Sequence, residues 1–296
     1  MHPAFDNESN PPFDIVRPAQ QRVPFVFNSP HSGRAYPDEM IKNSRLTAHS
    51  LRQSEDVFVD HLFDSVVEIG APLLRARFPR AWLDVNREPY ELDPQLFSER
   101  LPAHANTRSV RVAGGLGTIP RLVAENQPIY STPPTLEEAT LRIESVYRPY
   151  HQTLRHLIAE TVVEFGHATL IDCHSMPSRG AKKEGGSRPD VIIGDRYGTS
   201  CNGSISRELM KRFEEHGYSV ARNKPYAGGF ITEHYGRPLK GLNAVQIELN
   251  RSLYMDESTL RVHNGYPRLA ADIRSVIQSV VSLPDINFAP YSAAAE

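Results

Sequence analysis

Two histidines follow segments of the chain that have the composition of buried strands. His31 lies in the turn SPHSG after the segment RVPFVFN, and His174 lies in DCHSM after the segment ATLI. In open α/β sheets, ligands bind outside the carboxyl ends of the strands. Two imidazoles and one carboxylate from the pair Glu55 and Asp56 could bind a zinc ion and leave a coordination position for water. The residue types therefore indicate a hydrolytic metal site, although a histidine at a strand end can also serve only to complete a hydrogen bond.

The acidic pair has a second interpretation. We expect a helix from Ser54, which is a good N-cap, to Ile69, with Gly70 after its end. Glu55 and Asp56 would then lie in the first helical turn, where a carboxylate favours the helix dipole without binding anything. Both the ligand role and the structural role stay open for these two acids.

Glu248 is the candidate for a general base. It lies in AVQIELN, residues 244–250, which alternates between apolar and polar side chains from Val245 onward, as a strand covered on one face does. A glutamate in the middle of such a strand is costly unless its face is wet or catalytic. Hydrolytic metal sites need a carboxylate near the attacking water, and Glu248 fits that role.

Several polar side chains adjoin the segments that reach this site. Arg87 follows the apolar segment AWLDV, and its guanidinium could hold a carboxylate bidentately. Asn86 shares a face with Asp84 if that segment is a strand. A surface position is the ordinary alternative for each arginine. The candidate substrate-binding residues are Arg87, Arg237, Arg251, Arg179 and Asn86.

The elements that must position these residues alternate between strands and helices, which indicates the α/β class. We expect strands over residues 22–28, 72–78, 81–85, 168–171, 189–194, 218–222 and 244–250. Helices are expected over 54–69, from Thr135 toward Gly166 with a break at Pro149, from Ser200 or Asn202 to Gly217, and over 257–281 with an interruption near Gly265. Residues 1–21 should be a loosely ordered arm, and 22–296 a single domain.

Composition excludes several functional classes. The formal net charge of −2 and a pI near 6.6 give no support for nucleic acid or an anionic membrane as partner. No apolar run is long enough to span a bilayer, and the start of the chain does not have the pattern of a signal peptide. Two cysteines make no disulfide framework and fit a cytoplasmic location. The oligomeric state stays open.

Several long motifs of the chain resemble the N-formylglutamate amidohydrolase family, and the resemblance extends from about residue 23 to about residue 280. These motifs are SPHSG (29–33), SEDVFVD (54–60), LDVNR (83–87), DCHSM (172–176), RPDVIIGDRYGTSC (188–201), GGFITEHYGRP (228–238) and QIELNRSLYMDE (246–257). The resemblance implies a zinc-exopeptidase-like fold, a three-layer α/β sandwich around a mixed, mostly parallel sheet. It also implies hydrolysis of N-formyl-L-glutamate to glutamate and formate, in the degradation of histidine.

The same resemblance implies roles for particular residues. His31 and His174 would bind the metal, which we expect to be Zn²⁺, although another divalent metal fits as well. The acid ligand would be Asp56, with Glu55 as the alternative, and Glu248 would match the catalytic glutamate of related zinc hydrolases. Two other functions stay open, namely a zinc hydrolase of other N-acyl amino acids and a non-catalytic small-acid binding protein of the same fold.

Overall fold

The computed structural model of the 296-residue chain describes residues 4–5, 10–178 and 189–282. The chain divides into two compact units, which are described separately below. The prediction of a single domain over 22–296 stays a prediction, because a division by contacts does not show whether the units fold separately. The first unit comprises Met1–Asp14, Pro30–Asp56 and Arg75–Arg155, and the second comprises Ile15–Ser29, Val57–Leu74 and His156–Glu296.

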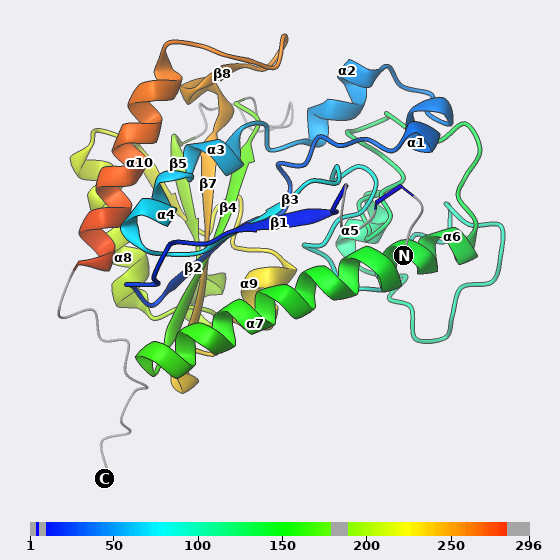
Figure 1. Ribbon diagram of the computed structural model, residues 1–296. Coiled ribbons are helices and arrows are strands. Elements are labelled where there is room, and N and C mark those ends of the chain that lie inside the picture. The colour runs from blue at the N-terminus through cyan, green and yellow to red at the C-terminus, as the bar shows by residue number, and fades with distance from the viewer. Residues whose placement is uncertain (1–3, 6–9, 179–188, 283–296) are drawn as a thin grey trace. The chain divides into compact units, whose positions relative to one another are not determined.

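A seven-stranded sheet in the order β1-β3-β2-β4-β7-β5-β6 organises the chain (Figure 1). Neighbouring strands from β2 to β6 run parallel except β7 and β5, which run antiparallel. This arrangement confirms the predicted mixed, mostly parallel sheet. The strands are β1 (Phe13–Val16), β2 (Phe25–Ser29), β3 (Leu73–Ala76), β4 (Ala168–Met176), β5 (Val191–Gly194), β6 (Val220–Arg222) and β7 (Leu242–Asn250). A separate antiparallel pair consists of β8 (Met255–Asp256) and β9 (Arg261–Val262).

One face of the second unit's sheet carries its apolar core. Side chains alternate along a strand, so Val245, Ile247 and Leu249 of β7 lie on the same face as their β4 neighbours Ile171 and Cys173. Each large apolar side chain buried there stabilises the fold by about 1.5–3 kcal/mol. The helices that contribute to this core are α3 (Val59–Leu62), α4 (Ser65–Ile69), α8 (Gly203–Glu215) and α10 (Gly265–Val281). In Figure 1, α8 and α10 lie side by side.

The opposite face of the same strands is polar. Asp172 and His174 of β4 pair in register with Gln246 and Glu248 of β7, so these four side chains share one face. Helix α9 (Phe230–Tyr235) contacts β4 and β7. The alternation that identified the strand over 244–250 thus separates its core residues from the residues that could do chemistry.

Both cysteines are free and fully buried within the apolar core. Cys173 lies between Asp172 and His174 in sequence but on the other face of β4. Burial raises the pKa of the Cys173 thiol well above its ordinary value, and burial raises the pKa of the Cys201 thiol as well.

The first unit contains short helices joined by long loops. Thr135 caps its helix as predicted, because its hydroxyl accepts a hydrogen bond from the Glu138 amide at 3.1 Å. The chain does not break at Pro149, because it passes from Arg142 through a π-helical segment, Ile143–Tyr147, directly into the long helix α7. The helices are α1 (Asp38–Lys42), α2 (Ala48–Leu51), a 3₁₀ turn (Arg52–Ser54), α5 (Val110–Ala113), α6 (Leu136–Arg142) and α7 (Arg148–Phe165), whose last part belongs to the second unit.

Two of the predicted elements are wrong. The helix expected over 54–69 is two short helices, because Phe58 has a left-handed backbone (φ 62°) and the first of them begins only at Val59. The strand expected over 81–85 is a turn, in which the Trp82 and Leu83 amides donate to the Pro79 carbonyl. The apolar side chains of this segment are buried. Its apolar composition therefore correctly indicated burial but not the backbone conformation.

Two further boundaries differ from expectation. Residues Phe13–Val16, expected to be loosely ordered, form β1. The last helix starts at Gly265 instead of residue 257, because β8, a turn and β9 occupy 255–262. Across the described part of the chain, no helix combines the length and the apolar character needed to cross a bilayer.

Candidate metal centre and catalytic residues

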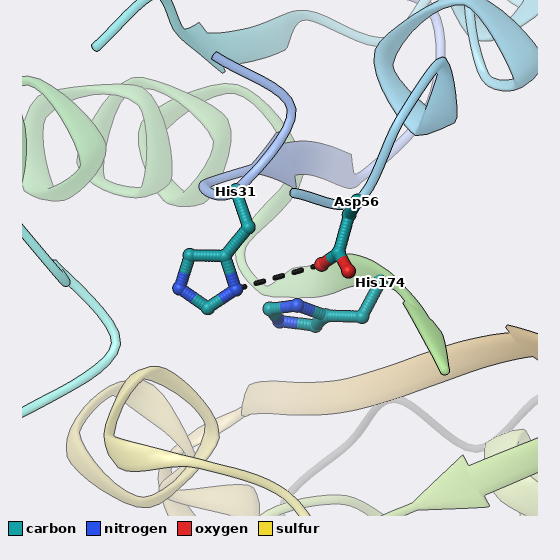
Figure 2. Close-up of side chains that lie close together, drawn as sticks. All are labelled: His31, Asp56 and His174. Atoms are coloured by element: carbon teal, nitrogen blue, oxygen red, sulfur yellow. Dashed lines mark ion pairs between the residues drawn. The ribbon is translucent and has the colours of Figure 1, made fainter. Parts of the chain in front are cut away.

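His31 follows the end of β2 by two residues and is buried between two carboxylates. Its Nε2 lies 2.8 Å from Asp84 Oδ1, and its Nδ1 lies 3.5 Å from Asp56 Oδ2 (Figure 2). The Asp56 amide also donates to the His31 carbonyl at 3.0 Å, which fixes the two residues together. A carboxylate only accepts hydrogen bonds, so Nε2 carries the hydrogen and Nδ1 carries the lone pair of the neutral ring. A histidine held in this way presents Nδ1 to a metal.

Asp84 is itself fixed by two arginines. Arg80 Nε lies 3.0 Å from Asp84 Oδ2, and Arg87 Nη2 lies 3.4 Å from the same oxygen. Burial acts to raise the pKa of Asp84, but the positive charges of Arg87 and Arg80 and the contact with His31 outweigh it and hold that pKa well below its usual range. Asp84 is therefore ionised at neutral pH and can orient the imidazole.

His174 has the same kind of partner on β4. Its Nε2 lies 2.8 Å from Asp172 Oδ2, two residues earlier on the same face of the strand. The second oxygen of Asp172 accepts a hydrogen bond from Asn28 Nδ2 at 2.7 Å. All three side chains are buried. The tautomer is again fixed, and Nδ1 is again the nitrogen with the lone pair.

The predicted donor set is present as a group. His31, Asp56 and His174 each offer a ligand atom, and these atoms lie within 4.8 Å of one another (Figure 2). Two imidazoles and one carboxylate are the donor set that zinc takes in hydrolytic sites, so the residues fit the metal. Glu55, the alternative acid, is held elsewhere, because Arg52 Nε donates to both of its oxygens at 3.0 and 3.2 Å.

Glu248 lies on β7 next to the strand that carries His174, and the two residues are direct partners in the register of β4 and β7. The side chain is buried, and its Oε1 accepts a hydrogen bond from Gln246 Nε2 at 2.6 Å. A carboxylate in this position faces the same side of the sheet as the His174 ring.

The arginines expected to bind substrate are in different situations. Arg251 is buried at the carboxyl end of β7, and its Nε donates to Ser175 Oγ at 3.1 Å. Arg87 donates from Nε to the Leu116 carbonyl at 2.8 Å and from Nη1 to the Asn86 carbonyl at 2.7 Å. Asn86 and Arg87 thus belong to the surroundings of Asp84, whereas Arg251 lies at the strand ends near His174.

Arg237 is not brought together with Glu248. Its backbone pairs with Leu242, the first residue of β7, and its side chain is exposed. Glu248 lies six residues further along this strand, or about 20 Å at the rise of an extended chain. Arg179 lies outside the described residues.

A sequence model described as N-formylglutamate amidohydrolase matches residues 23–255, which is most of the chain. The chain belongs to the N-formylglutamate amidohydrolase family. It is 31% identical over 242 residues to an N-formylglutamate deformylase of Pseudomonas putida, covering 81% of this chain and 84% of that protein. It is 30% identical over 263 residues to an N-formylglutamate deformylase of Pseudomonas aeruginosa, covering 88% and 92%.

The fold agrees with a solved structure of the same family. The crystal structure of N-formylglutamate amidohydrolase from Ralstonia eutropha JMP134 superposes with a TM-score of 0.86 at 33% identity, over 91% of this chain and 98% of that chain. The family resemblance and the zinc-exopeptidase-like α/β fold class that it implied are thus confirmed.

Two residues of this family member escaped the sequence reasoning. Asp84 was noted only for sharing a face with Asn86, although an acid inside the apolar segment AWLDV needs a buried partner. That signal indicated a partner but could not name His31, which is 53 residues away. Gln246 was read only as part of a polar strand face.

Proposed function

We propose that this member of the family is a metal-dependent amidohydrolase that cleaves N-formyl-L-glutamate to L-glutamate and formate. The observation that carries the proposal is the buried His/Asp/His donor set, in which each histidine is held through Nε2 by a buried aspartate. The curated relatives named N-formylglutamate deformylase support the substrate.

The metal would be held by His31, Asp56 and His174, and their nitrogen and oxygen donors favour Zn²⁺ while accepting other divalent metals. A divalent ion supplies Lewis-acid polarisation of the formyl carbonyl and lowers the pKa of water. Asp84 and Asp172 keep the two imidazoles in the tautomer that binds such an ion.

Glu248 is the residue that we assign to the proton transfers. Its carboxylate accepts a proton from water as the water oxygen bonds to the formyl carbon. The same proton then passes to the amide nitrogen as the carbon–nitrogen bond breaks, so that glutamate leaves as an amine and the formyl group as formate. One carboxylate thereby acts first as base and then as acid.

The two carboxylates of the substrate need cationic partners, because burying them unpaired costs too much free energy. Arg251 is the arginine whose position supports this role, since it lies buried at the strand ends beside Ser175. Roles for Arg87, Asn86 and Arg179 stay predictions. The position of Arg237 at the other end of β7 gives its predicted role no support.

Steady-state kinetics on four compounds tests the proposal. We expect N-formylglutamate to be hydrolysed faster than N-acetylglutamate, and both faster than N-formylglutamine or N-formylleucine by roughly 10²-fold or more in kcat/KM, the effect of a lost charge pair. Chelation should abolish turnover, and zinc should restore it. Equal rates on the leucine and glutamate derivatives would favour a general N-acyl amino-acid hydrolase. Binding of glutamate without hydrolysis of any compound would favour a small-acid binding protein.

A role in histidine degradation and a cytoplasmic location follow from the family resemblance and the sequence composition. Both remain predictions for this chain. Loss of growth on histidine as nitrogen source after deletion of the gene would test the first, and cell fractionation would test the second.

A further inference from the structure

Gln246 contacts the candidate base and is assigned no role by the proposed mechanism. It lies two residues before Glu248 on the same polar face of β7 and is buried. Its Nε2 donates to Glu248 Oε1 at 2.6 Å, and its Oε1 accepts a hydrogen bond from the Gly229 amide at 3.0 Å. The nitrogen of this side-chain amide therefore faces an acceptor, and its oxygen faces a donor.

The two contacts fix the orientation of the amide. A backbone N–H can only donate, so the oxygen of Gln246 must face Gly229. The NH₂ group must then face Glu248, where it meets an acceptor. A flipped amide would set donor against donor at Gly229 and carbonyl against carboxylate at Glu248. A hydrogen bond to a charged carboxylate is among the stronger ones, so Gln246 restricts the rotation of the Glu248 side chain.

The backbone at Gly229 can approach Gln246 because the neighbouring strand β5 carries a glycine at this point. Gly194 of β5 is the register partner of Gln246. A Cβ at Gly194 would come within 2.8 Å of the Ala227 carbonyl carbon and 2.9 Å of the Gly228 nitrogen. Only a residue without a side chain lets the segment 227–229 lie this close to the sheet. Gly194, the glycine of VIIGD, thus allows the Gly229 amide to lie beside Gln246.

We propose that Gln246 is a positioning residue, which holds the Glu248 carboxylate in the rotation that proton transfer requires. The proposal rests on the proposed function of Glu248 as general base. The terminal torsion of a glutamate side chain is broad, so the strand alone does not fix the carboxylate plane. The Gly229 amide fixes the orientation of the Gln246 side chain, and Gln246 in turn fixes the orientation of the Glu248 carboxylate. The backbone segment just before α9 therefore determines how the base is oriented.

Gln246→Met, Glu248→Gln and the double variant test the proposal in the metal-loaded enzyme. Methionine has a similar length and forms neither hydrogen bond. We expect Gln246→Met to lower kcat roughly 10- to 100-fold, the range for losing a group that orients a reacting side chain. KM for N-formylglutamate and metal content should stay close to those of the wild type. The double variant should turn over no more slowly than Glu248→Gln alone, because Gln246 acts only through Glu248.

The matched control is Gln278→Met, an exposed glutamine on α10, which should leave kcat unchanged. If Gln246→Met fails to fold, Gln246→Asn serves instead, because it keeps an uncharged amide but its shorter side chain cannot reach both the Gly229 amide and Glu248. It should also lower kcat. Wild-type kcat in either variant, or a double variant that multiplies the two single losses, would overturn the proposal. Full activity of Glu248→Gln would overturn the base assignment itself, and the positioning role with it.

Discussion

Asp172→Asn removes the charge that holds His174 while leaving the shape of the side chain almost unchanged. The two oxygens of Asp172 accept hydrogen bonds from His174 Nε2 at 2.8 Å and from Asn28 Nδ2 at 2.7 Å. Asparagine offers one oxygen and one NH₂ group, so it can accept only one of these two donors. The variant must therefore release either the imidazole or the Asn28 amide.

Two magnitudes follow from this geometry. Loss of the carboxylate partner of a ligating histidine typically weakens metal binding 10- to 100-fold, or about 1.4–2.7 kcal/mol. A buried donor left without its acceptor costs about 1–3 kcal/mol of stability, which the metal-free protein should show as well. In a protein of this size, that cost lowers Tm by about 2 °C for each kcal/mol.

Chelator competition gives the first quantity, and thermal unfolding of the chelated protein gives the second. The matched control is Asp64→Asn, since Asp64 Oδ2 accepts from His61 Nδ1 at 3.0 Å in an exposed pair. This control should change neither quantity. If Asp172→Asn lowers Tm but binds metal as tightly as the wild type, the asparagine oxygen has kept the imidazole and released the Asn28 amide. Asp172→Ala then decides, because it offers the imidazole no acceptor, and equally tight metal binding in that variant would show that His174 is a structural histidine and that the ligand set is wrong.

Three further predictions concern single side chains. His174→Ala should lose stoichiometric metal, measured by elemental analysis, because only two protein ligands remain; retention of one metal per chain would contradict this. Asp56→Asn should weaken metal binding in a chelator titration, whereas Glu55→Gln should not, since Arg52 holds Glu55; the reverse result would exchange their roles. Burial acts to raise the pKa of Asp195, but the hydrogen bonds that this carboxylate accepts, first that from Arg222, outweigh burial. The pKa of Asp195 therefore lies below its ordinary value of about 3.9. Asp195→Asn should therefore lower Tm at neutral pH, and the difference from wild type should decrease as the pH falls below about 4 and disappear below that lowered pKa; a difference that does not decrease below pH 4 would exclude an ionic origin.

The sequence predicted the strand faces well because they depend on local alternation. The pattern of AVQIELN placed Glu248 on a polar face, and in the structure Glu248 shares that face with Gln246 and His174. Such patterns report which residues share a face. They do not report which distant loop meets that face, so the pairing of His31 with Asp84 could not be read from them.

Arg237 illustrates the second limit. It was expected near the site because it adjoins the segment that contains Glu248. A nine-residue strand is about 30 Å long, so residues just before it and just after it lie at opposite ends of the strand. Arg251 follows β7 and Arg237 precedes it, and only the first lies at the carboxyl end. The distinction depends on strand boundaries, which local sequence defines poorly.

The thiol of Cys173 has a kinetic consequence. It is buried on the core face of β4, directly beside His174 in the chain, with its pKa raised well above the ordinary value. Only a thiolate reacts readily with alkylating reagents, so this cysteine can be labelled only while β4 is open to solvent. The rate of its labelling therefore measures how often the strand that carries a candidate ligand leaves the sheet. A metal ion bound by His174 would hold β4 in the sheet and prevent this labelling. The labelling rate of Cys173 in the metal-loaded protein would then report the rate at which the metal is released.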